Sequence, residues 1–234
     1  MKPSIHYYVL SLNNHTSKLY EGFRDQLIDI QHMGFPYHFP AEQADRLIED
    51  LPAEELRASL IETNKSFNEY YDQEPLGLII IGAPRSVTIF QSVMTHPGST
   101  LGTISGDFTN FSPHDLEKVI WPVLMATIAG NRQNAMSDLE TASAGNTLLS
   151  GIDAVASSAF FDSSSILFVE EDFHVSTNIM KKGHSQIADL YDDLWEVFND
   201  VVDIHIARVL EAGGHVMFMD AGTMGAFGRI ALVQ

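Results

Sequence analysis

A helix, a glycine stop and a buried strand follow one another in Val209-Leu210-Glu211-Ala212-Gly213-Gly214-His215-Val216-Met217-Phe218-Met219. Gly213 is well placed to end the helix, because only glycine reaches positive φ without a Cβ clash. A second apolar stretch, Gly228-Arg229-Ile230-Ala231-Leu232-Val233, predicts a further buried strand that closes the chain. The end of the protein is therefore expected to combine helix and sheet.

The first half of the chain opens with a β-hairpin pattern. Apolar, β-prone residues run over 7–12 and return over 17–22, and 27–30 is a third candidate strand. Helical spacing of apolar residues after Pro52 predicts a helix through Tyr71. The apolar run 78–81 is typical of a strand that is buried on both faces, and residues 83–85 turn the chain into a helix over about 86–94.

The second half is predicted to be mostly helical at first. Ser112-Pro113-His114-Asp115 is a strong helix start, and we expect Pro122 to kink this helix and Gly130-Asn131 to break it. A polar helix (134–142), an apolar helix (149–160), the strand 166–169 and a long amphipathic helix (187–211) should follow. His205 is expected on the polar side or edge of that last helix.

This order of elements predicts an α/β fold with two lobes, residues 1–130 and 131–234. The apolar runs that are bounded by turn residues should form the buried strands of the sheets. The side chains expected to be buried there are Leu10, Leu12, Ile79, Ile81, Phe168, Val216 and Phe218.

Composition narrows the classes of protein that this chain can belong to. With 13 basic and 31 acidic residues, the formal net charge is −18. Proteins that bind nucleic acid usually offer clustered basic residues to the phosphates, and here Lys181-Lys182 is the only adjacent basic pair, which disfavours strong binding to naked nucleic acid. The acidic surface can serve solubility or meet a basic partner.

The chain contains no cysteine, which excludes disulfides, thiolate catalysis and cysteine zinc sites. No window holds the roughly 18 apolar residues of a membrane span, and the start of the chain lacks the apolar core of a signal peptide. A cytoplasmic protein without membrane attachment is expected.

Five segments, taken in order, resemble the bacterial archaeo-eukaryotic release factor group, which is related to class-one peptide chain release factors and Pelota. The segments are the hairpin 7–22, Leu76-Gly77-Leu78-Ile79-Ile80-Ile81-Gly82, the helix from Ser112-Pro113 to Trp121-Pro122, 165–172, and 209–232 with its two glycine turns. Together they span essentially the whole chain. The resemblance implies a ribonuclease-H-like middle domain without nuclease chemistry, followed by an α/β/α domain similar to ribosomal kink-turn-binding proteins.

Two features of the family are missing from this sequence. Release factors hydrolyse peptidyl-tRNA with a Gly-Gly-Gln loop between the hairpin strands and the following helix, and here the equivalent stretch, 31–50, contains only Gly34. The only Gly-Gly pair, Gly213-Gly214, lies at a helix end. The chain also starts at the middle-domain hairpin, without the codon-reading N-terminal domain. Stop-codon reading and peptide release are therefore not expected.

The candidate ligand-binding residues lie in two places. Glu170, Asp172 and His174 follow a buried strand, where α/β proteins bind ligands, and carboxylates with imidazole suit a cation or acid/base chemistry. The alternative is a solvated acidic loop. Arg85 opens a helix, where backbone N–H groups can hold an anion, and a plain strand–helix turn is the alternative.

The sequence leaves three functions open. The first is a non-catalytic translation- or ribosome-associated protein of the release-factor-like group, with the ribosome or a basic protein as its partner. The second is a small-molecule or metal-dependent enzyme that uses the acidic loop after the strand 165–169. The third is a homo-oligomer formed through the apolar face of the helix 187–211. No catalytic residue, metal ligand or cofactor is assigned.

Overall fold

The computed structural model describes residues 5–13, 16–43, 46, 50–145, 147–158, 160–176 and 200–234. The backbone contacts divide the chain into two units, one of which holds Ser4–Ile128 and the other Ala129–Gln234. Each unit has its own sheet and its own apolar core. The predicted mixed α/β fold is confirmed.

The 4–128 unit is built on a sheet with the strand order β3-β2-β1-β5-β6. Strands β1, β2 and β3 form an antiparallel meander, whereas β1, β5 and β6 run parallel. A short strand, β4, pairs with β2. The strands are β1 (His6–Leu12), β2 (Thr16–Phe23), β3 (Gln26–Ile30), β4 (Tyr37–His38), β5 (Gly77–Gly82) and β6 (Thr100–Ser105).

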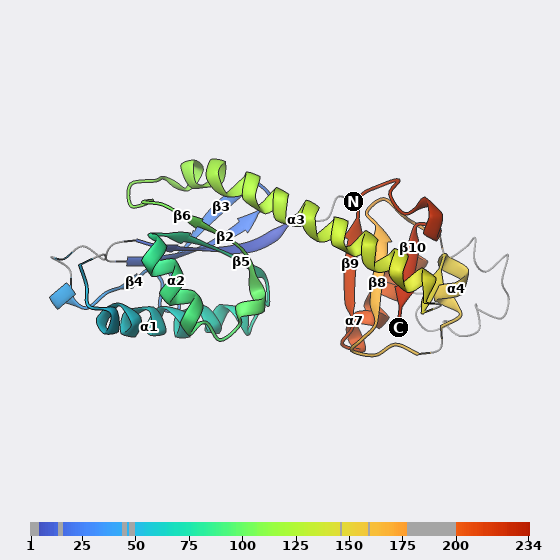
Figure 1. The fold of residues 1–234 in the computed structure, drawn as a ribbon, viewed down its shortest axis with the longest axis horizontal. Helices are drawn as coiled ribbons and strands as arrows, with labels where there is room; N and C mark the ends of the chain where they lie inside the picture. Colours follow the sequence, from blue (N-terminus) through green and yellow to red (C-terminus); the bar gives the residue numbers. More distant parts are fainter. Residues whose placement is uncertain are drawn as a thin grey trace. The chain divides into compact units, whose positions relative to one another are not determined.

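Helices cover both faces of this sheet, which explains why β1 and β5 carry apolar side chains on both faces. On one face α1 (Ala53–Tyr71) and α2 (Pro84–Val93) pack against residues such as Leu10 and Ile80. On the other face the first half of α3 (Pro113–Ala144) packs against residues such as Val9 and Ile79. The two layers are visible in Figure 1. Two 3₁₀ turns, η1 (Ala41–Gln43) and η2 (Pro97–Ser99), lie in the connections.

The helix starts follow the sequence signals. Pro52 and Pro84 lie at the first turns of α1 and α2, where proline sacrifices no helical hydrogen bond. The hydroxyl of Ser112 accepts a hydrogen bond from the N–H of Asp115 at 3.2 Å and donates to its carboxylate at 2.7 Å. These contacts satisfy one of the free donors at the start of α3.

The 129–234 unit has a four-stranded sheet in the order β7-β10-β8-β9. Strand β10 (Ile230–Val233) is antiparallel to β7 (Leu148–Ser150) and to β8 (Ile166–Glu170), and β8 is parallel to β9 (His215–Met219). The second half of α3 packs on one face. Helices α4 (Ile152–Ala156) and α7 (Val201–Glu211) pack on the other, which gives three layers, α/β/α. A 3₁₀ turn, η3 (Gly225–Phe227), precedes β10.

The glycine stop after α7 has the predicted conformation. Gly213 has φ +81°, its N–H donates to the carbonyl of Leu210 at 3.0 Å, and the N–H of Gly214 donates to the carbonyl of Val209 at 2.9 Å. This pair of bonds is the Schellman arrangement, which satisfies two carbonyls at the end of the helix. The chain then enters β9 directly.

Several sequence expectations were wrong. Helix α3 continues through Gly130-Asn131, so the expected break and the separate polar helix 134–142 do not exist. Two elements, β7 and α4, replace the expected helix 149–160, because Gly151 (φ +83°) turns the chain between them. Strand β6 was not predicted.

Two side chains of β9 are less buried than expected. Phe218 is 38% exposed and Val216 is half-buried, because β9 lies at the edge of its sheet and the described helices cover only part of it. The other five side chains expected to be buried are so: Leu10, Leu12, Ile79, Ile81 and Phe168. Residues 187–199 of the expected long helix lie outside the described residues. Within the described part of the chain, no helix has the length and apolar character that crossing a membrane requires.

Candidate functional site

The acidic residues after β8 form ion pairs with an arginine. Glu170, the last residue of β8, is only 1% exposed, and its carboxylate accepts hydrogen bonds from the N–H of Met224 at 2.7 Å and from Nε of Arg229 at 2.7 Å. Arg229 directly precedes β10 and also contacts the carboxylate of Asp172. The structure thus joins two predicted ligand residues through one guanidinium.

Glu170 stays ionised in this environment. Burial raises the pKa of its carboxyl, but the hydrogen bonds from Arg229 and from the N–H of Met224 outweigh burial, and the pKa is lowered from its ordinary value of 4.5. The buried carboxylate therefore needs its positive partner. The guanidinium of Arg229 also lies over the ring of Phe173, 5.1 Å from its centroid.

His174 belongs to a different group of contacts. Its Nδ1 is 2.6 Å from Oδ2 of Asp200, and Oδ1 of Asp200 accepts hydrogen bonds from the N–H groups of Val175 and Val202 at 3.0 and 2.9 Å. Asp200 is the N-cap of α7, so His174 lies next to a helix start. Among the described residues, the imidazole of His174 is therefore paired with Asp200 and not with Glu170 or Asp172.

A second arginine cluster lies in the same unit. Arg132, in the second half of α3, contacts the carboxylates of Glu171 and Asp220. Beside these groups is a hollow of about 230 Å³, lined by Ala129, Arg132, Gln133, Met136, Met219, Asp220 and Thr223. Two arginines thus pair with four carboxylates at and after the ends of β8 and β9, and a net negative charge remains.

Arg85, the remaining predicted residue, lies in the 4–128 unit. It follows Pro84 in the first turn of α2, and its Nη2 donates to the carbonyl of Leu51 at 2.7 Å. This bond ties the start of α2 to the segment that leads into α1. Binding of an anion at this turn stays a prediction.

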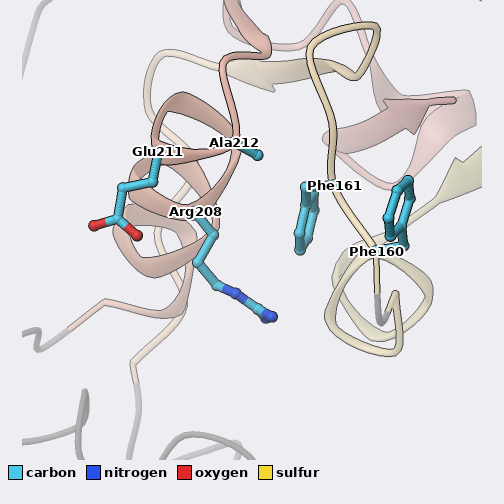
Figure 2. A pocket seen from close by; sticks show the side chains of 5 residues that line it. All are labelled: Phe160, Phe161, Arg208, Glu211 and Ala212. Carbon is cyan, nitrogen blue, oxygen red and sulfur yellow. The ribbon is translucent and has the colours of Figure 1, made fainter.

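A larger hollow lies beside the end of α7 (Figure 2). It has a volume of about 350 Å³ and is lined by Phe160, Phe161, Arg208, Glu211 and Ala212. The guanidinium of Arg208 lies over the Phe161 ring, 4.9 Å from its centroid, and Phe160 is 66% exposed. Glu211 points away from the two rings (Figure 2). These lining residues provide aromatic contact surface and a cation, with no nucleophile–base pair among them.

The aromatic residues of this hollow were missed by the sequence analysis. The carbonyl of Phe160 accepts a hydrogen bond from Nε2 of Gln234 at 2.6 Å, and the same nitrogen donates to Ser158 at 3.0 Å. The last residue of the chain thus holds the loop that carries Phe160. Two adjacent phenylalanines outside any predicted strand were the only sequence signal.

The described residues of the segment between β3 and α1 pack against α1. Phe35 and Phe39 are 4% and 6% exposed, and the hydroxyl of Tyr70 donates to the carbonyl of His32 at 2.5 Å. Gln43 is 7% exposed, and its side-chain oxygen accepts a hydrogen bond from Ser59 at 3.1 Å. The described part of this segment is therefore held by apolar and polar contacts.

Comparison with known protein families assigns the chain to one of them. The sequence pattern of bacterial archaeo-eukaryotic release factor family 3 matches residues 6–160, about two thirds of the protein. The chain belongs to this family. The resemblance that the sequence segments suggested is thereby confirmed. No curated protein sequence matches the chain.

Solved structures of release-factor relatives share the fold of this family member. Dom34 of S. cerevisiae, a translation termination-like factor involved in RNA quality control that interacts with Hbs1, is 9% identical with a TM-score of 0.52 over 98% of this chain and 63% of its own. Archaeal Pelota, in a ribosome-bound structure with ABCE1, is 13% identical with a TM-score of 0.50 over 97% and 60%. The family 3 chain thus spans about three fifths of the length of these structures, and at such identities the likeness concerns the fold alone.

Proposed function

We propose that this protein is a translation- or ribosome-associated member of the release-factor-like group that lacks peptide-release activity. The family match over residues 6–160 is the observation that carries the proposal. We further propose that residues 1–130 correspond to the family's middle domain and residues 131–234 to its C-terminal domain. Its partner would be the ribosome or a basic protein of the translation machinery, because the net charge of −18 suits a basic surface.

The segment between β3 and α1 supports the lack of peptide release. In the related class-one release factors, a Gly-Gly-Gln loop brings a glutamine to the peptidyl-tRNA ester. Here the stretch 31–50 has the single glycine Gly34, and its described glutamine near α1, Gln43, is buried and bonded to Ser59. Pro36 and Pro40 fix φ on both sides of the aromatic core of this segment. A side chain held in this way cannot reach an ester on another molecule without loss of these contacts.

The arginine clusters do not support the enzyme alternative. A metal ion after β8 would have to enter beside the guanidinium of Arg229, which already bridges Glu170 and Asp172. The guanidinium of Arg229 and a metal ion would compete for the same two carboxylates and would repel each other. A structural role, in which the ion pairs hold the chain before β10 to the end of β8, accounts for these contacts.

Ribosome association can be tested by sedimentation. Lysate of the native host is fractionated on a sucrose gradient, and the protein is expected to migrate with ribosomal particles. Because the acidic surface would act through charge, the association should weaken as salt rises. Migration only at the top of the gradient at every salt concentration would contradict ribosome docking. Capture with a basic protein that is not part of the ribosome would instead favour the basic protein as the partner.

The first prediction is that the protein releases no formyl-methionine from loaded ribosomes. The physical reason is the absence of a mobile Gly-Gly-Gln loop. The measurement is release of labelled formyl-methionine over a buffer control, with a bacterial class-one release factor as positive control. Release above buffer that disappears when Gln43 is replaced by alanine would refute the prediction.

The second prediction is weak and unspecific binding to naked RNA. A protein that neutralises several phosphates needs clustered basic side chains, and 13 basic residues are opposed by 31 acidic ones. We expect dissociation constants above about 1 μM at about 150 mM salt. Filter binding with ribosomal RNA fragments is the measurement, and sub-micromolar affinity for any fragment would show that the folded surface concentrates its cations. The first candidates for such a patch are Arg208 and the pair Lys181-Lys182, which lies outside the described residues.

A further inference from the structure

Three potential metal ligands converge in the 4–128 unit, whereas both arginine clusters belong to the 129–234 unit. His6 comes from β1, Glu21 from β2, and Glu74 from the turn after α1. Nε2 of His6 is 2.7 Å from Oε1 of Glu21, and Nδ1 is 3.1 Å from Oε1 of Glu74. One ligand atom from each of the three residues lies within 4.8 Å of the other two.

The fold holds these three side chains together. The antiparallel register places Tyr8 opposite Glu21 and His6 opposite Phe23, so His6 and Glu21 project from the same face of the sheet. The backbone of Glu74 is fixed by two hydrogen bonds, from its N–H to the carbonyl of Tyr70 at 3.0 Å and from the N–H of Leu76 to its carbonyl at 2.8 Å. Two strands of one hairpin and a turn that is distant in sequence thus meet at the imidazole of His6.

The imidazole of His6 is already oriented. Its ring stacks on Phe23, with centroids 4.1 Å apart and planes 19° apart, and the side chain is 18% exposed. A histidine that binds a metal usually has its second ring nitrogen bonded to a carboxylate, which fixes the tautomer and the ring orientation. Here the carboxylates at both nitrogens hold the ring in place, and one oxygen of each glutamate already lies within 4.8 Å of the ring nitrogen that would bind the ion.

The charge around His6 differs from that around Glu170. Within the described residues, the ion pairs of Glu21 and Glu74 are to His6 alone, whereas Glu170 is paired with an arginine. The site is therefore electronegative and has no permanent cation among the described residues.

We propose that His6, Glu21 and Glu74 bind one divalent transition-metal ion, of the Zn²⁺ or Mn²⁺ class. One imidazole with two carboxylates is a ligand set of borderline softness, which suits these ions better than Ca²⁺ or Mg²⁺. Ligand atoms about 2.1 Å from a common ion lie roughly 3–4 Å apart. The glutamates are 31% and 52% exposed, so they can open the present 2.7 Å separation by the small movement required. The ion would fasten the turn after α1 to the β1–β2 hairpin.

The test is calorimetric titration of the chelator-treated, untagged full-length chain with ZnCl₂, repeated with MnCl₂ and MgCl₂. We expect one saturable site for Zn²⁺ or Mn²⁺ and at least about 10-fold weaker binding of Mg²⁺. His6→Asn and Glu74→Gln should each weaken the binding at least about 10-fold. Glu74→Gln removes a charge from a half-exposed side chain, so the variant is expected to keep the fold of the wild type. Circular dichroism checks this.

His114→Asn is the matched control. Nδ1 of His114 is 3.1 Å from a carboxylate oxygen of Glu117, but this pair is a single histidine and a single glutamate one helix turn apart. The control variant should bind as the wild type does. Absence of saturable binding, or equal binding by the wild type and His6→Asn, would overturn the proposal. So would a loss in His114→Asn as large as in His6→Asn. The three side chains would then only form the contacts that the structure shows.

Discussion

Lowering the pH from 7 to 5 is expected to destabilise the 129–234 unit by about 2 kcal/mol, with His205 as the cause. The His205 side chain is fully buried on α7, and burial, with Arg208 as a second cause, lowers its pKa from 6.5 to about 4. The folded protein therefore keeps His205 neutral at pH 5, while the unfolded chain binds a proton there. Because the unfolded state binds more protons, the stability is fully present above pH 6.5 and decreases as the pH falls toward 4.

Urea denaturation at pH 7 and pH 5 measures this effect, with hydrogen exchange of β8 and β10 amides to assign the transition to the 129–234 unit. The variant His205→Gln cannot titrate, so its stability should change little between the two pH values, whatever its absolute stability. The low pKa of Glu170 keeps that carboxylate ionised at pH 5, so it does not contribute over this range. An equal loss of stability in His205→Gln and in the wild type would assign the pH dependence to other groups.

His205 also shows where the sequence was misleading. The periodicity of α7 placed this residue at the polar side or edge of the helix, but Val201, Val202 and Ile204 are buried with it. The apolar stripe of a helix predicts burial when one face meets a sheet. Here α7 contacts both the sheet and α4, so a wider face is covered than the stripe suggested.

Local signals predicted most of the elements, and long-range packing decided the rest. Proline and serine starts, the glycine stop and the short apolar runs gave α1, α2, the start of α3, β1, β5, β8 and β10. Gly130-Asn131 was predicted to break α3, but the propensity of two residues costs only about 1–2 kcal/mol. The second half of α3 buries Ala135 and Leu139 in the core of its unit, and this burial outweighs the cost.

The candidate site was predictable in its residues but not in its contacts. The sequence placed Glu170 and Asp172 after a buried strand, and that placement was correct. Their partner Arg229 lies 59 residues from Glu170 and reaches it only because β10 pairs with β8. The sequence analysis did not predict that pairing. It therefore could not tell whether the carboxylates of Glu170 and Asp172 pair with an arginine or bind a ligand. The same holds for His6, Glu21 and Glu74, because the register of β1 and β2 joins the first two and the turn after α1 brings in the third.

The last prediction concerns the two adjacent glycines at the end of α7, where alanine at Gly214 should cost more than alanine at Gly213. Gly213 has φ +81°, but a Cβ atom there meets nothing closer than 3.7 Å, so the cost is the backbone strain of about 1 kcal/mol. At Gly214 a Cβ atom would lie 2.7 Å from the carbonyl oxygen of Ser165 and 2.9 Å from that of Asp162. Backbone atoms cannot rotate away as side chains do, and we expect a loss of about 3 kcal/mol.

The reason for this order lies in the start of β9. The carbonyl of Ser165 accepts the hydrogen bond of His215 N–H at 2.9 Å, which begins the pairing of β9 with β8. The Cβ atom of an alanine at position 214 would push against that carbonyl. Moving the carbonyl away would relieve the clash but would weaken its hydrogen bond to His215. Urea denaturation of Gly213→Ala and Gly214→Ala gives both free energies, and faster hydrogen exchange at His215 should accompany only the second. Equal losses, or a greater loss in Gly213→Ala, would mean that positive φ and not close packing is what requires glycine at this turn.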